Sequence, residues 1–212
     1  MSKIIIDMGS GNTCQNCPSI VEHMIDEIKA IDTGKHEIII KWQLFEKAGE
    51  NIPLSHPIFN MAYDYAKEKG YKTTSSVFDL NSLKFLLNYN IPFIKIANRR
   101  DLDWLIGEVP RKISVYVSVG RNYRLGDSKL LYDGNNYIKM ACVSNYPAKK
   151  EEYEDNFLQE QLREHISDHT IGIDLFKKYQ PRIWEKHFKL FDSTGLDAGP
   201  FAITPEELRE IL

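Results

Sequence analysis

The feature that most constrains the fold is a repeated alternation of short apolar runs with longer amphipathic stretches along the 212 residues. The apolar runs have the length and composition of strands, and most of them precede a segment with helical spacing. Strands that alternate with helices predict a parallel sheet, and eight such units predict a closed (β/α)8 TIM barrel, with a doubly wound open sheet as the alternative. The expected strands are residues 3–8, 37–45, 72–76, 91–97, 112–119, 137–144, 166–169 and 182–190.

The helical pattern is less even than the strand pattern. Residues 120–136, which follow the fifth expected strand, are rich in Gly, Asn and Asp and carry no helical spacing. We therefore expect a compact α/β barrel with a reduced or missing fifth helix, as one domain over residues 1–212. A typical TIM barrel has about 250 residues, so a missing helix is consistent with the shorter length of this chain. The expected helices are residues 18–31, 56–69, 79–88, 101–106 and 150–165, one that ends at Tyr179, and one that begins at Thr204-Pro205.

Charge, hydropathy and cysteine content exclude several classes of protein. The net charge of −3 gives no basic field that would favour nucleic acid. No apolar run approaches the roughly 20 residues that a membrane-spanning helix needs, and the apolar run at the N-terminus is too short for a signal peptide. Three cysteines leave one unpaired, so a disulfide framework is not expected. The expected compartment is a reducing cytoplasm.

In a TIM barrel the active site lies at the carboxyl ends of the strands, and polar residues gather there in this sequence. Lys41 and Lys95 stand inside apolar runs, where a buried ammonium is costly unless an anion meets it. We predict that they bind an anion, although either one could face solvent at a strand end. The polar residues at the strand ends are Asp7, Asn12, Lys41, Gln43, Ser75, Ser76, Lys95, Asn98, Ser118, Ser144, Asn145, Tyr146, Ser167, Asp168, His169, Glu185 and His187.

Two histidines come from neighbouring strand ends. His169 and His187 suit a shared divalent cation, because neutral imidazoles are common ligands of such metals. Asp168 and Glu185 are close enough in sequence to orient the rings or to exchange protons. Two histidines by themselves are a weak signal, and packing without a metal is the plainer interpretation.

Six strings stand in order along the chain: IKWQLF at 40–45, FIKIA at 93–97, CVSNYPA at 142–148, SDHTIG at 167–172, WEKHFKL at 184–190 and TPEEL at 204–208. Together they resemble the sialic acid synthase family, which comprises N-acetylneuraminate synthase and relatives that make similar nonulosonic acids. The resemblance implies a (β/α)8 barrel that condenses phosphoenolpyruvate with an N-acetylated hexosamine, such as N-acetylmannosamine, and releases phosphate. The partners it implies are therefore phosphoenolpyruvate and an amino-sugar aldehyde, with a homo-oligomer as an open expectation.

The resemblance also implies roles for single residues. Lys41 is similar to a lysine on the carboxylate of phosphoenolpyruvate, and His169 and His187 are similar to two ligands of Mn²⁺ or Mg²⁺. Asp7 stands where the family has a glutamate near the sugar aldehyde, and Glu185 where it has a carboxylate beside a metal histidine. The implied phosphate set is Lys95, Ser76, Asn145 and Ser167, with Asn98, Ser118 and Tyr146 as further substrate contacts and Asp197 on the sugar.

The sequence departs from the family pattern at the sugar half of the site. Asp7 is one methylene shorter than the family's glutamate, and residues 97–100 read Ala-Asn-Arg-Arg where the family has Gly-Ser-Gly-Glu. The C-terminal antifreeze-like domain of the family is expected to be absent. Two alternatives therefore stay open: an anion-binding barrel that acts as a sensor or accessory subunit, and an aldolase that uses Lys41 or Lys95 as a Schiff-base lysine.

Overall fold

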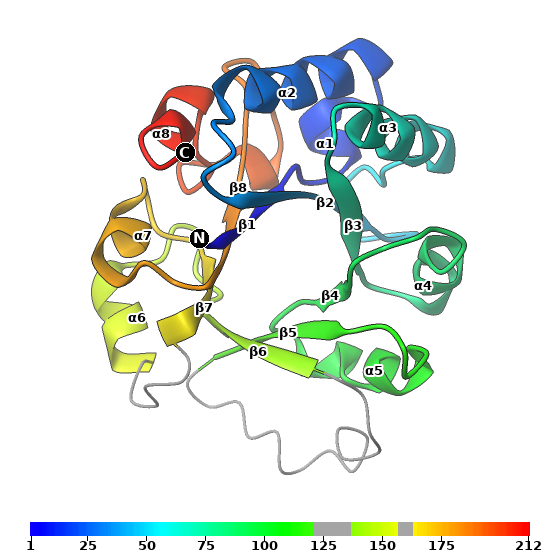
Figure 1. Ribbon diagram of the computed structural model, residues 1–212. Coiled ribbons are helices and arrows are strands. Elements are labelled where there is room, and N and C mark those ends of the chain that lie inside the picture. The colour runs from blue at the N-terminus through cyan, green and yellow to red at the C-terminus, as the bar shows by residue number, and fades with distance from the viewer. Residues whose placement is uncertain (121–136, 157–162) are drawn as a thin grey trace.

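Eight parallel strands close into a barrel in the computed structural model, which describes residues 1–120, 137–156 and 163–212. Figure 1 looks into this barrel, with the strands around the centre and the helices outside them. The TIM-barrel prediction is confirmed. The strands are β1 (Lys3–Asp7), β2 (Glu37–Leu44), β3 (Lys72–Val77), β4 (Ile94–Ile96), β5 (Val115–Val119), β6 (Tyr137–Cys142), β7 (His165–Asp168) and β8 (Ile183–His187).

The helices begin where the sequence carries start signals. Helix α2 has a proline at its first turn, where the missing N–H costs no hydrogen bond. Helix α8 begins with a capping box in which Thr204 and Glu207 satisfy each other's backbone N–H groups. The helices are α1 (Gly11–Cys14), α2 (Pro18–Ile31), α3 (His56–Glu68), α4 (Leu80–Leu86), α5 (Trp104–Glu108), α6 (Lys150–Asn156), α7 (Asp174–Tyr179) and α8 (Pro205–Arg209), with 3₁₀ turns η1 (Arg100–Leu102) and η5 (Leu196–Ala198).

Some expectations lie partly outside the described residues. The prediction of a reduced or missing fifth helix concerns residues 120–136, of which 121–136 are not described. Part of the expected helix 150–165 falls on residues 157–162, which are not described either. Strand β7 begins at His165, so the helix expected to reach this residue ends before it. Over the described ranges, no helix is long and apolar enough to cross a membrane.

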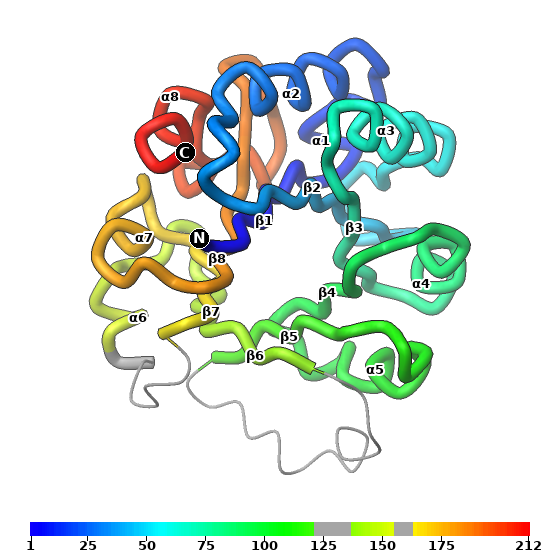
Figure 2. The backbone as a smooth tube through the Cα atoms, in the orientation of Figure 1, coloured from blue at the N-terminus to red at the C-terminus, as the bar shows by residue number. Residues whose placement is uncertain are grey.

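Closure of the barrel brings the first and last strands together. Figure 2 follows the backbone once around the barrel, from blue β1 to orange β8 beside it. In the registers of these strands, Asp7 lies opposite both Lys41 of β2 and His187 of β8. Because parallel strands end at the same edge, the polar residues at their carboxyl ends gather at one mouth of the barrel.

The barrel interior has an apolar floor. Phe93 and Tyr116 stack there with ring centroids 3.9 Å apart. The remaining floor residues are Ile5, Ile39, Met140 and Ile183, with Ile138 packed against them. A larger apolar cluster lies between the outer face of the strands and the helices, and it contains Trp42, Phe59 and Trp184. The floor thus fills the interior below the polar residues at the carboxyl ends of the strands.

Candidate active site

A cavity of about 300 Å³ opens at the carboxyl ends of the strands. Lys41 and Lys95 both line it, although they are only 1% and 2% exposed. The sequence-predicted residues that line the cavity are Asp7, Lys41, Ser76, Lys95, Asn98, Ser118, Tyr146, Ser167, His169, Glu185, His187 and Asp197. The structure therefore brings together nearly the whole candidate set.

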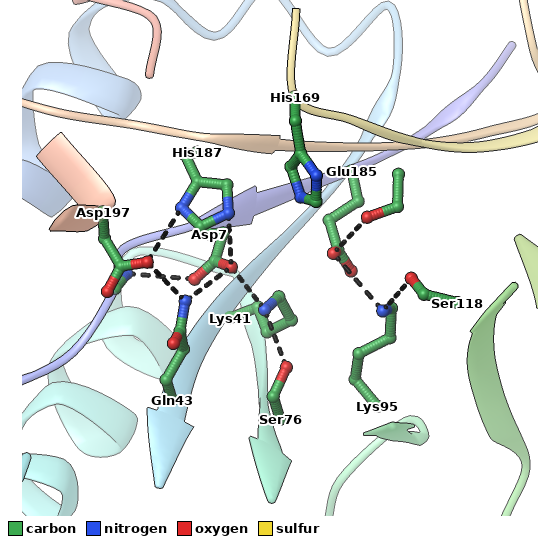
Figure 3. A network of polar contacts seen from close by, with 12 residues as sticks. Asp7, Lys41, Gln43, Ser76, Lys95, Ser118, His169, Glu185, His187 and Asp197 are labelled. Carbon is green, nitrogen blue, oxygen red and sulfur yellow. Dashed lines mark hydrogen bonds and ion pairs between the residues drawn. The ribbon is translucent and has the colours of Figure 1, made fainter. Parts of the chain in front are cut away.

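Lys41 is held between a carboxylate and a hydroxyl. Its Nζ donates to Asp7 Oδ2 at 2.6 Å and to Ser76 Oγ at 2.9 Å (Figure 3). Asp7 is the register partner of Lys41 on β1, and Ser76 lies two residues after Thr74, the register partner of Lys41 on β3, so that Ser76 and Thr74 share a face of the strand. The ammonium of Lys41 therefore forms one side of the cavity.

Gln43 extends this cluster toward the loop after β8. Its Nε2 donates to Asp7 Oδ2 at 3.1 Å and to Asp197 Oδ1 at 2.9 Å. The sequence places Gln43 at a strand end but gives it no role. The usable signal is its position two residues after Lys41, because alternate residues of a strand share a face.

A second cluster surrounds Lys95 on the other side of the cavity. Lys95 Nζ donates to Ser118 Oγ at 2.5 Å and lies 3.5 Å from Glu185 Oε1. The same carboxylate oxygen accepts a hydrogen bond from Ser167 Oγ at 3.0 Å. Glu185 Oε2 is buried and has no hydrogen-bond partner among the described residues. Figure 3 shows the two lysines pointing into the same space from neighbouring parts of the wall.

The two histidines lie side by side, with ring centroids 5.5 Å apart. His169 Nδ1 is 2.6 Å from the carbonyl oxygen of Val143, which can only accept, so Nδ1 carries the proton and Nε2 has the lone pair. His187 Nδ1 is 3.3 Å from Asp197 Oδ1, and its Nε2 is 3.5 Å from Asp7 Oδ2. Burial, followed by the neighbouring His187, holds the pKa of His169 well below its usual value, so the ring is neutral.

The carboxylates around His187 differ in their electrostatics. Burial alone would raise the pKa of Asp7, but Lys41 and His187 outweigh it and hold that pKa well below its usual value. Burial opposes the charge on Lys41, yet Asp7 and Glu185 raise the pKa of its ammonium. Burial, with Asp7 nearby, raises the pKa of Asp197. Asp7 and Lys41 are therefore an ion pair, which does not favour the neutral amine that a Schiff base needs.

Three predicted residues lie away from the base of the cavity, either at its rim or outside it. Asn145 is not among the lining residues, and its Nδ2 donates to Glu152 Oε1 at 2.5 Å. Tyr146 is 45% exposed at the rim, where the centroid of its ring lies 4.3 Å from the ring centroid of His169. Asn98 also stands at the rim and donates to Ser144 Oγ at 2.9 Å. The rim of the site is thus less enclosed than its base.

The expectation that Asp168 orients the histidine rings needs correction. Its side chain lies on the outer face of the barrel wall, where Oδ2 accepts from Trp184 Nε1 at 3.1 Å and Oδ1 lies 3.3 Å from Lys186 Nζ. The reason is the alternation of the strand: Ser167 and His169 face the cavity, so the residue between them faces outward.

The donors around the histidine pair match a divalent cation in part. No group of three or more His, Cys, Asp or Glu side chains is arranged to hold a metal ion in residues 1–120, 137–156 and 163–212. Two features still fit a cation: His169 presents a neutral ring, and His187 Nδ1 makes no hydrogen bond among the described residues, although the Asp197 carboxylate lies 3.3 Å from it. Two imidazoles beside carboxylates form a donor set that a divalent cation accepts.

Solved structures with the same fold were found. An N-acetylneuraminic acid (sialic acid) synthetase from Leptospira borgpetersenii serovar Hardjo-bovis, in complex with citrate, is 20% identical with a TM-score of 0.78, over 98% of this chain and 80% of that one. A spore coat polysaccharide biosynthesis protein E from Chromobacterium violaceum is 20% identical with a TM-score of 0.80, and the match covers 99% of this chain and 72% of that one. A truncated 3-deoxy-D-arabino-heptulosonate 7-phosphate synthase from Thermotoga maritima is 10% identical with a TM-score of 0.68, and the match covers 99% of this chain and 83% of that one.

Comparisons at the level of sequence give a family but no individual relative. No curated protein matches the chain. The sequence profile of the NeuB family matches residues 41–212, which include every residue to which the resemblance gives a role except Asp7. This match spans most of the barrel, from the lysine of β2 to the last helix. The chain belongs to the NeuB family.

Proposed function

We propose that the protein condenses phosphoenolpyruvate with an N-acetylated hexosamine, such as N-acetylmannosamine, to give a nonulosonic acid and inorganic phosphate. The observation that carries this proposal is the convergence of Lys41 and Lys95, both almost fully buried, on one cavity of about 300 Å³. Phosphoenolpyruvate bears negative charge at both ends, and ammonium groups with neighbouring hydroxyls bind such anions strongly. Membership of the NeuB family and the name of the Leptospira relative support the same reaction.

The two lysine clusters divide the binding of phosphoenolpyruvate between them. Lys41 would hold the carboxylate. Ser76, which the resemblance groups with the phosphate, accepts a hydrogen bond from Lys41 and would therefore help to hold the carboxylate instead. Lys95 would hold the phosphate together with the hydroxyls of Ser118 and Ser167. The anion would replace Glu185 as the partner of Lys95, and Asn98 stands at the rim for a further contact.

His169 and His187 would hold the divalent cation, Mn²⁺ or Mg²⁺. The hydrogen bond from His169 Nδ1–H to Val143 fixes the tautomer that leaves Nε2 free for a metal, as in many metal sites. A bound cation would polarise the aldehyde and stabilise negative charge on its oxygen. Asp197 and Gln43, on the same side as His187, would bind hydroxyl groups of the sugar.

The reaction forms one carbon–carbon bond and breaks one carbon–oxygen bond. C3 of phosphoenolpyruvate bonds to the aldehyde carbon, and the aldehyde oxygen takes up a proton. Water adds to C2 and loses one proton, which leaves a hydroxyl beside the phosphate ester on C2. The bond from C2 to the ester oxygen then breaks as the hydroxyl loses the second proton, so that phosphate leaves with a proton and a ketone remains. Asp7 and Glu185 are the carboxylates at the two lysine clusters that can exchange these protons. Holding both substrates in one orientation lowers the barrier further.

The direct test uses phosphoenolpyruvate labelled with ¹⁸O at the bridging oxygen, N-acetylmannosamine and Mn²⁺. We expect phosphate release, with the label in phosphate because the C2–O bond breaks. Label in the organic product, or no phosphate release with a panel of N-acetylated hexosamines, contradicts the proposal. Binding of phosphoenolpyruvate without turnover would favour the non-catalytic alternative, and borohydride trapping of pyruvate on Lys41 or Lys95 would favour the Schiff-base alternative.

A further inference from the structure

An ion pair that the proposed chemistry does not use lies on the outer face of the barrel wall. Asp168 of β7 and Lys186 of β8 are register partners, and both are 0% exposed. Lys186 Nζ lies 3.3 Å from Asp168 Oδ1. Burial of such a pair is costly, and apolar residues of similar size often serve stability as well or better. The buried ion pair therefore indicates a role other than stability.

The pair ties down the residue that follows the first histidine. Asp168 Oδ1 accepts hydrogen bonds from the Thr170 N–H at 2.8 Å and from the Thr170 hydroxyl at 2.7 Å. Lys186 Nζ donates to the carbonyl oxygen of Thr170 at 2.5 Å. Both backbone groups of Thr170 are thus held, one by a residue of β7 and the other by a residue of β8.

This arrangement bears directly on the two imidazoles. His169 lies between Asp168 and Thr170, and His187 follows Lys186. Because side chains alternate along a strand, the charged pair faces outward while the two rings face the cavity. The contacts outside the wall therefore join the backbone next to His169 to the strand that carries His187, and the two ring centroids lie 5.5 Å apart.

We propose that Asp168 and Lys186 form a positioning pair that sets the spacing of His169 and His187 for a divalent cation. The inference rests on the proposed function, because that function assigns the cation to these rings. Neither member of the pair touches the cation or a substrate. Each acts through the backbone of the strand that carries its histidine. Residues that orient metal ligands commonly change metal affinity about 10–100-fold when they are replaced.

The test is the double variant Asp168→Val/Lys186→Met, which removes both charges and every side-chain contact of the pair to Thr170, and leaves no unpaired buried charge. We expect the dissociation constant of Mn²⁺, measured by electron paramagnetic resonance of free Mn²⁺, to rise about 10–100-fold. Phosphoenolpyruvate binding at Lys95, measured without metal, should stay within about twofold. The matched control is Lys177→Met/Glu210→Gln, an exposed pair at 2.6 Å whose loss should leave the Mn²⁺ affinity unchanged.

A folded double variant with wild-type Mn²⁺ affinity would overturn the inference, since a merely structural pair changes the melting temperature alone. Absence of Mn²⁺ binding in the wild-type protein would instead refute the proposed cation. The positioning role is then decided by ¹⁵N–¹H spectra of the metal-free imidazoles. We expect a single Nδ1–H tautomer for His169 in the wild type and a shifted or mixed signal in the double variant. Identical imidazole signals in the two proteins would contradict the positioning role.

Discussion

The floor and the mouth of the barrel interior are built from the same strands but differ in chemistry. The two layers are two residues apart along the chain: Ile39 and Lys41 lie on β2, and Phe93, directly before β4, is followed by Lys95 on β4. The same step leads from apolar to polar side chains elsewhere: Ile5 to Asp7, Tyr116 to Ser118, Met140 to Cys142 and Ile183 to Glu185. Because residues at i and i+2 of a strand share a face, the strands present both layers to the same interior.

The difference between the layers separates stability from chemistry. The floor is closed and apolar, so it contributes to stability through burial. The mouth holds charges that are buried in pairs and border an open cavity, so its groups are available to a ligand. A substitution in one layer and a substitution two residues away should therefore give opposite profiles of stability and activity.

The largest effect on stability is expected in the floor. Phe93→Ala removes a ring that is fully buried and stacked on Tyr116, and it leaves a void that the rigid strands cannot fill. We expect the free energy of unfolding to fall by about 3–5 kcal/mol. Urea denaturation followed by circular dichroism measures this loss. A loss below about 1 kcal/mol would mean that the floor is not a packed layer. Turnover per folded molecule should be retained in this variant.

The matching change in the mouth is Lys95→Met, two residues further along the chain. It removes the cation that we assign to the phosphate, and we expect turnover to fall about 10²–10³-fold, as for other lost electrostatic contacts to a reacting group. Water in the open cavity can hydrate Glu185, so the variant should remain folded by circular dichroism. Steady-state phosphate release measures the effect, and wild-type turnover in the variant would remove Lys95 from the site.

A smaller effect is expected at the serine beside that lysine. Ser118→Ala removes the hydroxyl that accepts a hydrogen bond from Lys95 at 2.5 Å. Hydrogen bonds to charged groups contribute about 1.5–3 kcal/mol, so we expect the KM for phosphoenolpyruvate to rise about tenfold or more. Ser193→Ala, in the loop after β8, is a control that should leave this KM unchanged. An unaltered KM in Ser118→Ala would place the phosphate elsewhere in the cavity.

The smallest effect is expected at Asn145, for which the family resemblance and the structure give different predictions. The resemblance implies that Asn145 binds phosphate, whereas in the structure its amide donates to Glu152 outside the cavity. From that geometry we expect Asn145→Ala to change the KM for phosphoenolpyruvate less than about threefold, in the range of distant substitutions. A tenfold increase would show that the loop after β6 rearranges when the substrate binds.

The sequence predicted the barrel because period-two strands and period-3.6 helices alternate strongly along it. It also indicated Lys41 and Lys95, since a charge within an apolar strand is conspicuous. The direction of Asp168 was also within reach of the sequence, since strict alternation places a residue between two cavity residues on the outer face, but the list of strand-end residues did not apply that rule. Asn145 could not be oriented in this way, because it lies in a loop after the last residue of β6. Loop side chains follow local hydrogen bonds that no periodicity reveals.

The central claim is that the two lysines of the mouth bind one anionic substrate. Calorimetric titration of phosphoenolpyruvate into the wild type, Lys41→Met, Lys95→Met and Phe93→Ala tests it most directly. The account predicts binding to the wild type and to folded Phe93→Ala, and loss of binding in each lysine variant. Binding that persists in both lysine variants, or that is absent in the wild type with and without Mn²⁺, would contradict it.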